Sequence, residues 1–448
     1  MKSIPLFFSR TQNKIARQVL LGFALAILTG SLILLIPQAT QSGKISYIDA
    51  LFTSTSAICV TGLVVQDTAT YFTDLGKAAI LIMIQIGGLG IITVGSIFSL
   101  ILRRKTSIKD RFYIETSFGT ERSFSVSKFF MAIAATTFTI EFTGFIITTL
   151  IFHFKHLYPV RTSMTFGLFH TVSAFNNAGF SLYSNNLEGF VSDIPLNLII
   201  MFLIVTGGIG FPVISEIITF RRRRKLLSLH AKVVLTVTGI LIITGALLFF
   251  ILEFNNPDSI KDKPVPTKIL ASFFQSITSR TAGFNTINIG KLYPATQLLL
   301  VILMFIGASP GGTGGGIKTT TFAVVAAAGL SFVRSRKEVI MFKRKIPASL
   351  VQRALALTIV AVTLIIISTT CLLIFERCSL MEALFDVVSA FGTVGLSTGI
   401  TPSLSTASKI VLIATMFIGR IGISTLSLAI AMRSVADRIT YPEDTVNF

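Results

Sequence analysis

One short pattern occurs four times in this chain, each time inside a long apolar stretch, and it ends on a glycine followed by leucine or phenylalanine. The copies are residues 52–62, 169–179, 273–283 and 385–395, and each begins with phenylalanine ten residues before the glycine. The glycines recur at intervals of roughly 110 residues, which is too long for solenoid units of about 20 to 50 residues. Each interval has room for two membrane spans and a re-entrant segment. The repetition therefore predicts four similar units around one ion pore.

The composition is that of an integral membrane protein. Hydrophobic residues make up 52% of the chain and charged residues only 13%, with a mean hydropathy of +0.78, whereas roughly a quarter of the residues of a soluble domain are charged. The first apolar stretch, 19–36, lacks a clear small-residue cleavage site, which favours a retained helix over a signal peptide. The three cysteines are too few for a disulfide framework and have no metal-ligand spacing, so they leave the redox compartment undetermined.

The net charge of +19 is explained better by membrane topology than by nucleic-acid binding. Its clusters at 103–105, 221–225 and 334–345 each follow an apolar span. An excess of lysine and arginine marks cytoplasmic loops. We therefore expect a multi-pass protein of the cytoplasmic membrane with these loops and both termini in the cytoplasm.

The predicted fold is an all-α membrane protein with four pseudo-repeats of helix, pore helix and helix around one central pore, giving eight transmembrane helices. The repeats are expected at 1–112, 113–226, 227–346 and 347–448. Their first spans are expected at 18–36, 129–152, 230–252 and 353–375, and their returning spans at 78–102, 196–220, 296–333 and 409–432. The first pore helix, 46–59, is too short to cross a bilayer, and Ser46 and Asp49 are candidates for its N-terminal cap.

A second glycine motif repeats in step with the first, at 87–90, 207–210, 311–314 and 419–422. Two motifs that recur in the same register are not expected by chance. Small residues also allow membrane helices to approach closely, and close packing is the simpler interpretation for the first two copies.

The segment that ends on each filter glycine is predicted to leave the helix and to present backbone carbonyls to the pore. Non-helical backbone is tolerated at membrane depth only where protein or water surrounds it, and glycine can adopt the backbone angles required. Rings of carbonyl oxygens can replace the hydration shell of an ion. The segments contain no carboxylate, which favours a monovalent cation over calcium. The predicted filter residues are Cys59, Val60, Thr61 and Gly62; Asn176, Asn177, Ala178 and Gly179; Arg280, Thr281, Ala282 and Gly283; and Gly392, Thr393, Val394 and Gly395.

The strings at 173–180, 280–285 and 389–396 resemble the filter sequences of the Trk/Ktr/HKT potassium transporter superfamily, and the similarity covers almost the whole chain. The short length and eight expected spans resemble the KtrB and KtrD type of membrane subunit more than TrkH. The resemblance implies potassium uptake stimulated by sodium and a homodimer with one pore per subunit. It also implies activation by a cytosolic, nucleotide-binding RCK ring of the KtrA/KtrC type, so any nucleotide is expected on that partner and no covalent cofactor on this chain. Serine at the first filter glycine is associated with sodium transport in the superfamily, so Gly62 favours potassium.

The resemblance also implies an intramembrane gate loop at about 307–318, where glycine and proline are dense enough to break a helix on physical grounds alone. A static kink is the competing interpretation. The predicted gate residues are Ser309, Pro310, Gly311, Gly312, Thr313, Gly314, Gly315, Gly316, Lys318 and Arg420. Lys318 does not directly follow the last glycine, which argues against a phosphate-binding loop. A central arginine in a span costs about 2.5 to 3.5 kcal/mol on insertion scales, so Arg420 should face the pathway or a protein partner, although a purely structural role stays open.

Other charged residues are expected to be structural. A cation on the pore axis would oppose potassium entry, so Arg280 should point behind the filter and bond to backbone or a carboxylate. Glu141 and Glu216 are interpreted as structural pairs ahead of proton relays. The main alternative functions are a sodium or ammonium transporter of the same fold and, in another class, a membrane-bound enzyme. The enzyme is disfavoured because no catalytic arrangement occurs near the glycine motifs.

Overall fold

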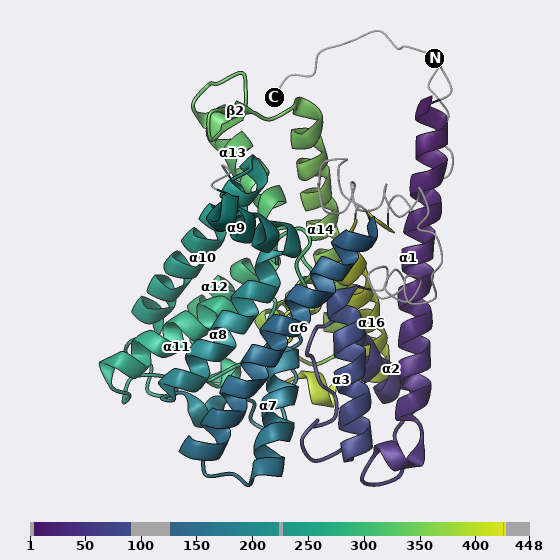
Figure 1. Ribbon diagram of the computed structural model, residues 1–448, viewed down its shortest axis with the longest axis vertical. Coiled ribbons are helices and arrows are strands. Elements are labelled where there is room, and N and C mark those ends of the chain that lie inside the picture. Colours follow the sequence, from purple (N-terminus) through teal and green to yellow (C-terminus); the bar gives the residue numbers. More distant parts are fainter. Residues whose placement is uncertain (1–3, 91–125, 224–226, 424, 427–448) are drawn as a thin grey trace.

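The computed structural model describes residues 4–90, 126–223, 227–423 and 425–426, and this part of the chain is almost entirely helical (Figure 1). The first half contains α1 (Ile4–Leu34), η1 (Pro37–Ala39), α2 (Tyr47–Ile58), α3 (Asp74–Leu89), α6 (Val126–Leu150), the π-helical turn η2 (Ile151–Lys155), α7 (Val160–Phe175), η3 (Glu188–Phe190), α8 (Ile194–Ile209) and α9 (Phe211–Arg223). The second half contains α10 (Leu229–Glu253), α11 (Val265–Thr278), η4 (Ile289–Lys291), α12 (Pro294–Phe305), α13 (Thr319–Val333), β1 (Ile340–Met341), β2 (Arg344–Lys345), α14 (Ala348–Phe375), α15 (Leu380–Gly392), η5 (Thr401–Ser403) and α16 (Thr406–Ile421).

The four predicted first spans are confirmed as the long helices α1, α6, α10 and α14. Each contains an apolar stretch long enough to cross a membrane, and the bent pair α8 and α9 could supply a fifth span among the described residues. The total of eight stays a prediction, because the returning spans expected at 78–102 and 409–432 extend beyond the described residues. The four repeat boundaries also stay predictions.

A helix of 12 to 16 residues follows each long helix: α2, α7, α11 and α15. The predicted cap of the first is confirmed, because Ser46 Oγ accepts a hydrogen bond from the Asp49 N–H at 3.1 Å. The fourth begins with a capping box, in which Ser379 and Glu382 each satisfy the other's backbone N–H. Pro159 and Pro264 directly precede α7 and α11, and these prolines keep the helices from extending toward the N-terminus.

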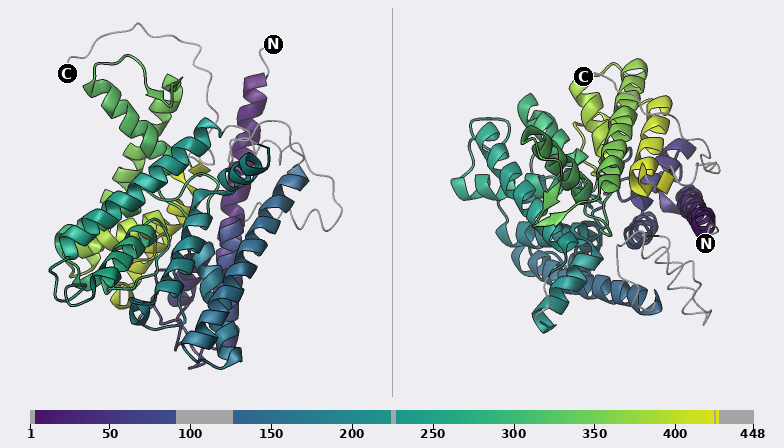
Figure 2. Two further views of the ribbon diagram at one scale, coloured as in Figure 1. Left: turned by 60° about the vertical axis from the view of Figure 1, so that its left-hand side comes forward. Right: turned by 90° about the horizontal axis from the view of Figure 1, so that it is seen from above.

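The helices close into a ring (Figure 2, right). The returning helix of each unit packs on the short helix of the next, with α3 on α7, α8 on α11, α12 on α15, and α16 back on α2. An ion pair closes the ring, because Lys409 on α16 lies 2.7 Å from the Asp49 carboxylate on α2. The ends of the short helices therefore meet at one centre.

Three returning helices end on the last glycine of the second motif. Gly90, Gly210 and Gly422 follow α3, α8 and α16 with φ values of 81°, 98° and 84°, which glycine adopts without the steric cost of a Cβ. The continuous span expected at 196–220 is wrong, because α8 and α9 meet at an angle of 101° across Gly210. The motif therefore terminates helices, which the packing interpretation did not foresee.

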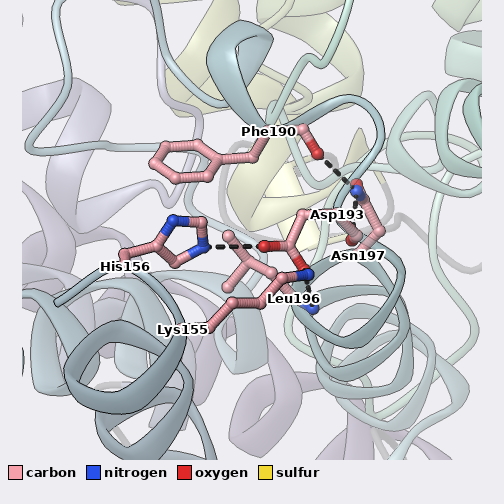
Figure 3. A network of polar contacts seen from close by, with 6 residues as sticks. All are labelled: Lys155, His156, Phe190, Asp193, Leu196 and Asn197. Atoms are coloured by element: carbon pink, nitrogen blue, oxygen red, sulfur yellow. Dashed lines mark hydrogen bonds and ion pairs between the residues drawn. The ribbon is translucent and has the colours of Figure 1, made fainter.

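A polar cluster fixes the start of α8 beside the π-helical turn (Figure 3). The carboxylate of Asp193 accepts a hydrogen bond from the Leu196 N–H at 3.0 Å and contacts Lys155 at 2.9 Å and His156 at 2.7 Å. Burial by itself raises the pKa of Asp193, but the Leu196, Lys155 and His156 contacts outweigh it and hold the pKa below its ordinary value. The charge of Asp193 is thereby matched to the N-terminal end of the α8 dipole.

The basic segment after α13 is exposed and includes a small hairpin, β1 and β2, paired antiparallel. Phe332 and Val333 beside it are 85% and 79% exposed. The basic cluster at 103–105 and the C-terminal arginines lie outside the described residues, and the side chains at 221–225 are not described.

Candidate ion pathway

The four glycine segments share one unusual backbone conformation. The glycine has a φ of 91°, 69°, 80° or 92° in the four copies. The residue two positions earlier is also left-handed, with φ values of 50° at Val60, 58° at Asn177, 77° at Thr281 and 52° at Thr393. Such conformations cost on the order of 1 to 3 kcal/mol for residues other than glycine and concentrate at functional sites. Sequence alone contains no signal for the earlier position, because valine, asparagine and threonine share no preference there.

Hydroxyl groups at the ends of the short helices hold these segments in place. Ser56 Oγ and Ser389 Oγ each accept a hydrogen bond at 3.0 Å from the N–H of the glycine in their own copy, Gly62 and Gly395. Ser173 instead donates to the Phe180 carbonyl at 2.8 Å. The serines that recur six residues before the glycine therefore act as local anchors of the chain.

The third copy is displaced by one residue relative to the sequence alignment. Thr278 takes the place of the missing serine and donates to the Phe284 carbonyl at 2.5 Å, and the Ala282 N–H returns to the Thr278 carbonyl at 2.9 Å. Phe274 is fully buried, whereas Phe273, which the alignment matched to the other phenylalanines, is 37% exposed. The alignment of Phe273 and Ile277 is therefore wrong, because the connection from helix to glycine is one residue shorter in this copy.

The four glycines form a closed ring in which each lies against the next copy. A Cβ added to Gly62 would lie 2.4 Å from the Ala178 carbonyl oxygen, and one added to Gly179 would lie 2.8 Å from that of Ala282. For Gly283 the distance is 2.3 Å to the Val394 oxygen, and for Gly395 it is 2.2 Å to the Thr61 oxygen. The cycle returns to the first copy, so the carbonyl before each glycine borders the glycine of the neighbouring unit.

An open cavity of about 330 Å³ lies over this ring and is lined by all four glycines. Two of its lining residues are acidic, Asp67 and Glu188. Burial raises the pKa of Asp67, but hydrogen bonds from Ser184, Ala69 and Thr70 outweigh it and hold the pKa below its ordinary value. Asp67 is therefore ionised at neutral pH, and an acidic mouth raises the local concentration of cations.

In the second glycine segment, the side chain of Asn176 is held by polar groups. Asn176 Nδ2 donates to Glu141 Oε1 at 2.9 Å and to Gln85 Oε1 at 3.1 Å, so a buried carboxylate of α6 lies behind the second segment. The carboxylate of Glu141 accepts hydrogen bonds from the side-chain amides of Asn176 and Gln85. The structural partners predicted for Glu141 are therefore neutral groups. Glu216, on α9, accepts hydrogen bonds from the N–H and hydroxyl of Ser228.

Arg280 lines a small cavity together with residues of α8 and α10, such as Gly208 and Thr238. It is 8% exposed, and its Nε is buried without a hydrogen-bond partner. The predicted bond to backbone or carboxylate is therefore not made through this atom.

The loop between α12 and α13 crosses the bundle directly beside the filter segments. Its two ends pair with each other, because the Gly307 N–H donates to the Ile317 carbonyl at 2.9 Å. Gly315 N–H donates to Thr393 Oγ1 at 2.8 Å, and a Cβ at Gly314 would lie 1.9 Å from Thr281 Oγ1. Only glycine fits at these two points without displacing filter side chains.

The other face of the loop bonds to the broken returning helix α8. Ser309 N–H donates to the Gly208 carbonyl at 3.0 Å and Thr313 N–H to the Gly207 carbonyl at 3.1 Å. The Phe211 N–H, which begins α9, donates to the Gly311 carbonyl at 3.2 Å. The loop therefore satisfies backbone groups that the break at Gly210 would otherwise leave unpaired.

Two cations lie at the loop. Arg420 donates through one guanidinium nitrogen to the Thr313 carbonyl and through the other to the Gly87 carbonyl of α3. Lys318 Nζ donates to the Gly314 carbonyl at 2.7 Å. Pro310 and Gly312 lie in the same turn, where the Gly312 N–H donates to the Ser309 carbonyl at 3.0 Å, and Gly316 has a φ of 70°. The gate role of these residues stays a prediction.

The first glycines of the second motif pack on the ends of the short helices. A Cβ at Gly87, Gly207 or Gly419 would lie 2.0, 1.8 or 2.0 Å from the carbonyl oxygen of Ile58, Phe175 or Phe391. Each of these carbonyls belongs to the residue four before a filter glycine. Close packing is thus one role of the motif and helix termination the other.

Sequence reasoning missed Asn186, Lys409 and the partners of Glu141. Asn186 follows the second filter segment in an irregular loop, where no periodicity indicates which side chain faces the ring. The partners Lys409 and Asp49 are 360 residues apart, and a single sequence gives no signal for such a pair.

The chain matches the profile of the family described as TrkH, cation transport protein, over residues 8–439. It is 39% identical over 426 residues to Ktr system potassium uptake protein B of Bacillus subtilis strain 168, which covers 95% of each chain. It is 37% identical over 433 residues to the protein of the same name from Vibrio alginolyticus, covering 96% of this chain and 94% of the relative.

A further relative is the potassium/sodium uptake protein NtpJ of Enterococcus hirae, 34% identical over 432 residues and 95% of each chain. Among solved structures, the crystal structure of the potassium transporter TrkH from Vibrio parahaemolyticus matches with a TM-score of 0.70. The match covers 92% of this chain and 84% of that one at 21% identity. This likeness shows the fold.

Proposed function

The chain belongs to the TrkH cation transport family, a family of transporters and not of enzymes, and from this premise we propose that it takes up potassium across the cytoplasmic membrane. Ions pass through the ring of the four glycine segments, whose backbone carbonyls act as the selectivity filter. The names of the relatives from Bacillus subtilis and Vibrio alginolyticus support potassium as the substrate.

The observation that carries this proposal is the closed ring of four glycines beneath one cavity. Neutral carbonyl oxygens can replace the hydration shell of a monovalent ion, whereas rings of carboxylates are used by many other cation pores. The acidic groups Asp67 and Glu188 lie at the outer cavity, where they attract cations without entering the ring.

Transport measurements in liposomes that contain only this subunit test the proposal. Uptake of potassium or rubidium down its gradient should exceed that of sodium and ammonium, and a strain lacking potassium uptake should regain growth at low potassium. Equal or faster sodium or ammonium flux would instead assign the chain to the alternative substrates. The potassium/sodium name of the Enterococcus hirae relative makes sodium the more relevant competitor.

The gate is proposed to be the loop 307–318, held by Arg420. Glycine at 311, 312 and 314–316 allows the loop more than one arrangement, and Arg420 ties it to the fixed end of α3 through Thr313 and Gly87. Opening would release the bond to Thr313 and move the loop away from Thr281 and Thr393.

Deletion of part of 311–316, or Arg420→Ala, should therefore raise rubidium flux into liposomes in the absence of any regulator. Arg161→Ala, an exposed arginine at the start of α7, is the matched control and should conduct like the parent. If both loop variants fold and neither conducts better than the control, the loop is a structural break and the gate lies elsewhere.

A cytosolic nucleotide-binding ring is the proposed regulator, and the exposed segment at 332–345 its docking surface. The Ktr system named in the relatives supports a second subunit, and a homodimer follows from the superfamily resemblance. The segment combines the exposed apolar residues Phe332 and Val333 with basic side chains. Anionic lipid is the competing partner for the basic side chains.

Neutralising Arg334, Arg336 and Lys337 should abolish co-purification with the ring. Lys44, Lys261 and Lys263, in loops joining the opposite ends of the helices, provide a control with the same change in charge. Full retention of the complex in the first variant, with normal insertion, would show that the charge serves topology or lipid contact and not docking.

A further inference from the structure

We propose that Asn186 is an additional ligand and specificity-determining residue of the outermost cation site, a proposal that rests on the filter function above. The side chain lies at the floor of the outer cavity. Its Nδ2 donates to the carbonyl oxygen of Gly179 at 3.3 Å and to that of Gly283 at 3.4 Å. These carbonyls belong to neighbouring copies of the ring.

The two carbonyls that Asn186 contacts show where its side-chain amide lies relative to the ion pathway. Two carbonyls that converge on one N–H₂ group also converge on the place where a cation entering the ring would lie. A donor and a cation seek the same lone pairs, so the amide of Asn186 occupies or borders that place. Among the hydrogen bonds of the described residues, no other side chain donates to a carbonyl of the four glycines.

The amide oxygen of Asn186 could bind the ion directly, whereas the amide nitrogen donates to the carbonyls that the ion would otherwise contact. Within the described part of the chain, Asn186 Oδ1 is buried and has no hydrogen-bond partner, and a buried polar atom left unpaired calls for a specific reason. Rotation about the last side-chain bond is soft and exchanges the nitrogen and the oxygen. Oδ1 would then lie beside the Gly179 and Gly283 carbonyls, as a third neutral oxygen around one cation.

The loop is built to hold Asn186 in this place. Asn186 has a φ of 53°, which asparagine tolerates better than most residues, and its N–H donates to the Tyr183 carbonyl at 3.0 Å. The next residue, Leu187, donates through its N–H to the Asn285 carbonyl at 3.0 Å, and Asn285 Nδ2 donates to Glu188 Oε1 at 2.9 Å. The loop of the second unit is thus bonded to the third unit, and through Asn186 it also contacts Gly283 of that unit.

This arrangement gives the ring an asymmetric entrance. The corresponding loops of the other units use their polar side chains within their own unit or on the second unit. Asn288 Oδ1 caps Gly290, Ser397 bonds to Asp386, and Asp67 bonds to Ser184. Among the described residues, an ion therefore meets an amide bonded to the glycine carbonyls from one side of the ring only.

The test compares Asn186→Ala with Asn185→Ala in concentration-dependent rubidium and sodium uptake by proteoliposomes. Asn185 is the same residue type in the same loop, but its side chain is exposed. Asn186→Ala should raise the KM for rubidium about three- to tenfold, the equivalent of one ordinary hydrogen bond or ion ligand, with the maximal rate little changed. Asn185→Ala should match the parent.

A structural role would give a different result, because a poorly folded variant lowers the maximal rate while the remaining molecules keep their KM. An unchanged KM in Asn186→Ala would overturn the proposal, whether or not the maximal rate falls. A lower KM, caused by loss of a competing donor, would overturn it as well. Asn186→Asp is the second variant and decides if the alanine variant does not insert. Its carboxylate should lower the KM for both ions and reduce the preference for rubidium, and an unchanged KM would overturn the proposal.

Gly283→Ser in the same series separates the two proposals. If it lowers ion discrimination and the Asn186 variants behave like Asn185→Ala, the filter stands and the role of Asn186 falls. If Gly283→Ser leaves discrimination unchanged, the filter falls and the assignment of Asn186 falls with it.

Discussion

Replacing Gly283 with serine should lower the preference for potassium over sodium by about tenfold or more. The new Cβ would lie 2.3 Å from the Val394 carbonyl oxygen and 3.0 Å from Gly179 Cα, at a φ of 80°. A left-handed backbone costs a residue with a Cβ roughly 1 to 2 kcal/mol. The contact with the Val394 oxygen adds strain that the ring can relieve only by moving that carbonyl. Each 1.4 kcal/mol of lost discrimination is about a factor of ten.

The four glycines should not respond equally, because their clearances differ. Gly62, Gly283 and Gly395 leave 2.2 to 2.4 Å between the added Cβ and the nearest carbonyl oxygen, whereas Gly179 leaves 2.8 Å. Serine or alanine at Gly179 should therefore perturb the potassium to sodium ratio least.

Gly43→Ala separates ring distortion from backbone strain. Gly43 has a φ of 69°, but the nearest atom to its added Cβ is 4.0 Å away. This variant should lose stability by a similar roughly 1 to 2 kcal/mol and keep the parent's ratio of rubidium to sodium uptake. Uptake ratios in all four filter variants that equal that of Gly43→Ala would refute the reasoning, as would Gly179 being the most sensitive position.

Three further changes test the supports of the site. Lys409→Met should destabilise the protein by about 3 to 5 kcal/mol in thermal unfolding, because it leaves Asp49 buried and unpaired, and Lys409→Met combined with Asp49→Leu should recover most of this loss. Glu141→Ala should reduce the potassium to sodium uptake ratio and lower the free energy of unfolding by about 1 kcal/mol, since Asn176 loses one acceptor but keeps others. An unchanged uptake ratio would make Glu141 a purely structural residue. Asp193→Asn should be less stable than the parent at neutral pH, and the difference in stability should vanish only as the pH falls below the ordinary carboxyl pKa of about 3.9. The reason is that the folded-state pKa of Asp193 is lowered, so its stabilisation is lost only when the folded protein takes up the proton. A difference that disappears near pH 6 would contradict this assignment.

The elements predicted correctly are those specified by local sequence. Long apolar runs gave α1, α6, α10 and α14, and serine followed by an acidic residue three positions later gave the start of α2. The four repeated glycines were located correctly as special backbone positions, because each has a positive φ that disfavours a Cβ, whereas their role as a filter stays a prediction. By contrast, Val60 is left-handed despite its branched side chain, so tertiary contacts override its local preference.

The errors of sequence reasoning arise where the structure departs from uniform repetition. The shortened connection in the third copy moved Phe274 and Thr278 into places assigned to Phe273 and Ile277, because counting back from the glycine assumes equal lengths. Glycine in the second motif was interpreted as packing, since the same residue serves close approach and helix termination. The structure separates the two uses, because the first glycine of a copy packs on a short helix and the last one ends a helix, as at Gly87 and Gly90.

Arg420 shows why the structural and gating interpretations of a buried cation need not exclude each other. Its two carbonyl partners differ in kind: Gly87 lies in the last turn of α3, where carbonyls have no partner within the helix, and Thr313 lies in the loop. At membrane depth such carbonyls need a donor, and a guanidinium supplies several in one plane. The bonds offset the insertion cost of the charge, so a fixed helix end anchors the arginine while a segment able to move completes its coordination. A movement of the loop that exchanged Thr313 for water would leave the bond to Gly87 intact, and the cation would remain beside the pathway in both states.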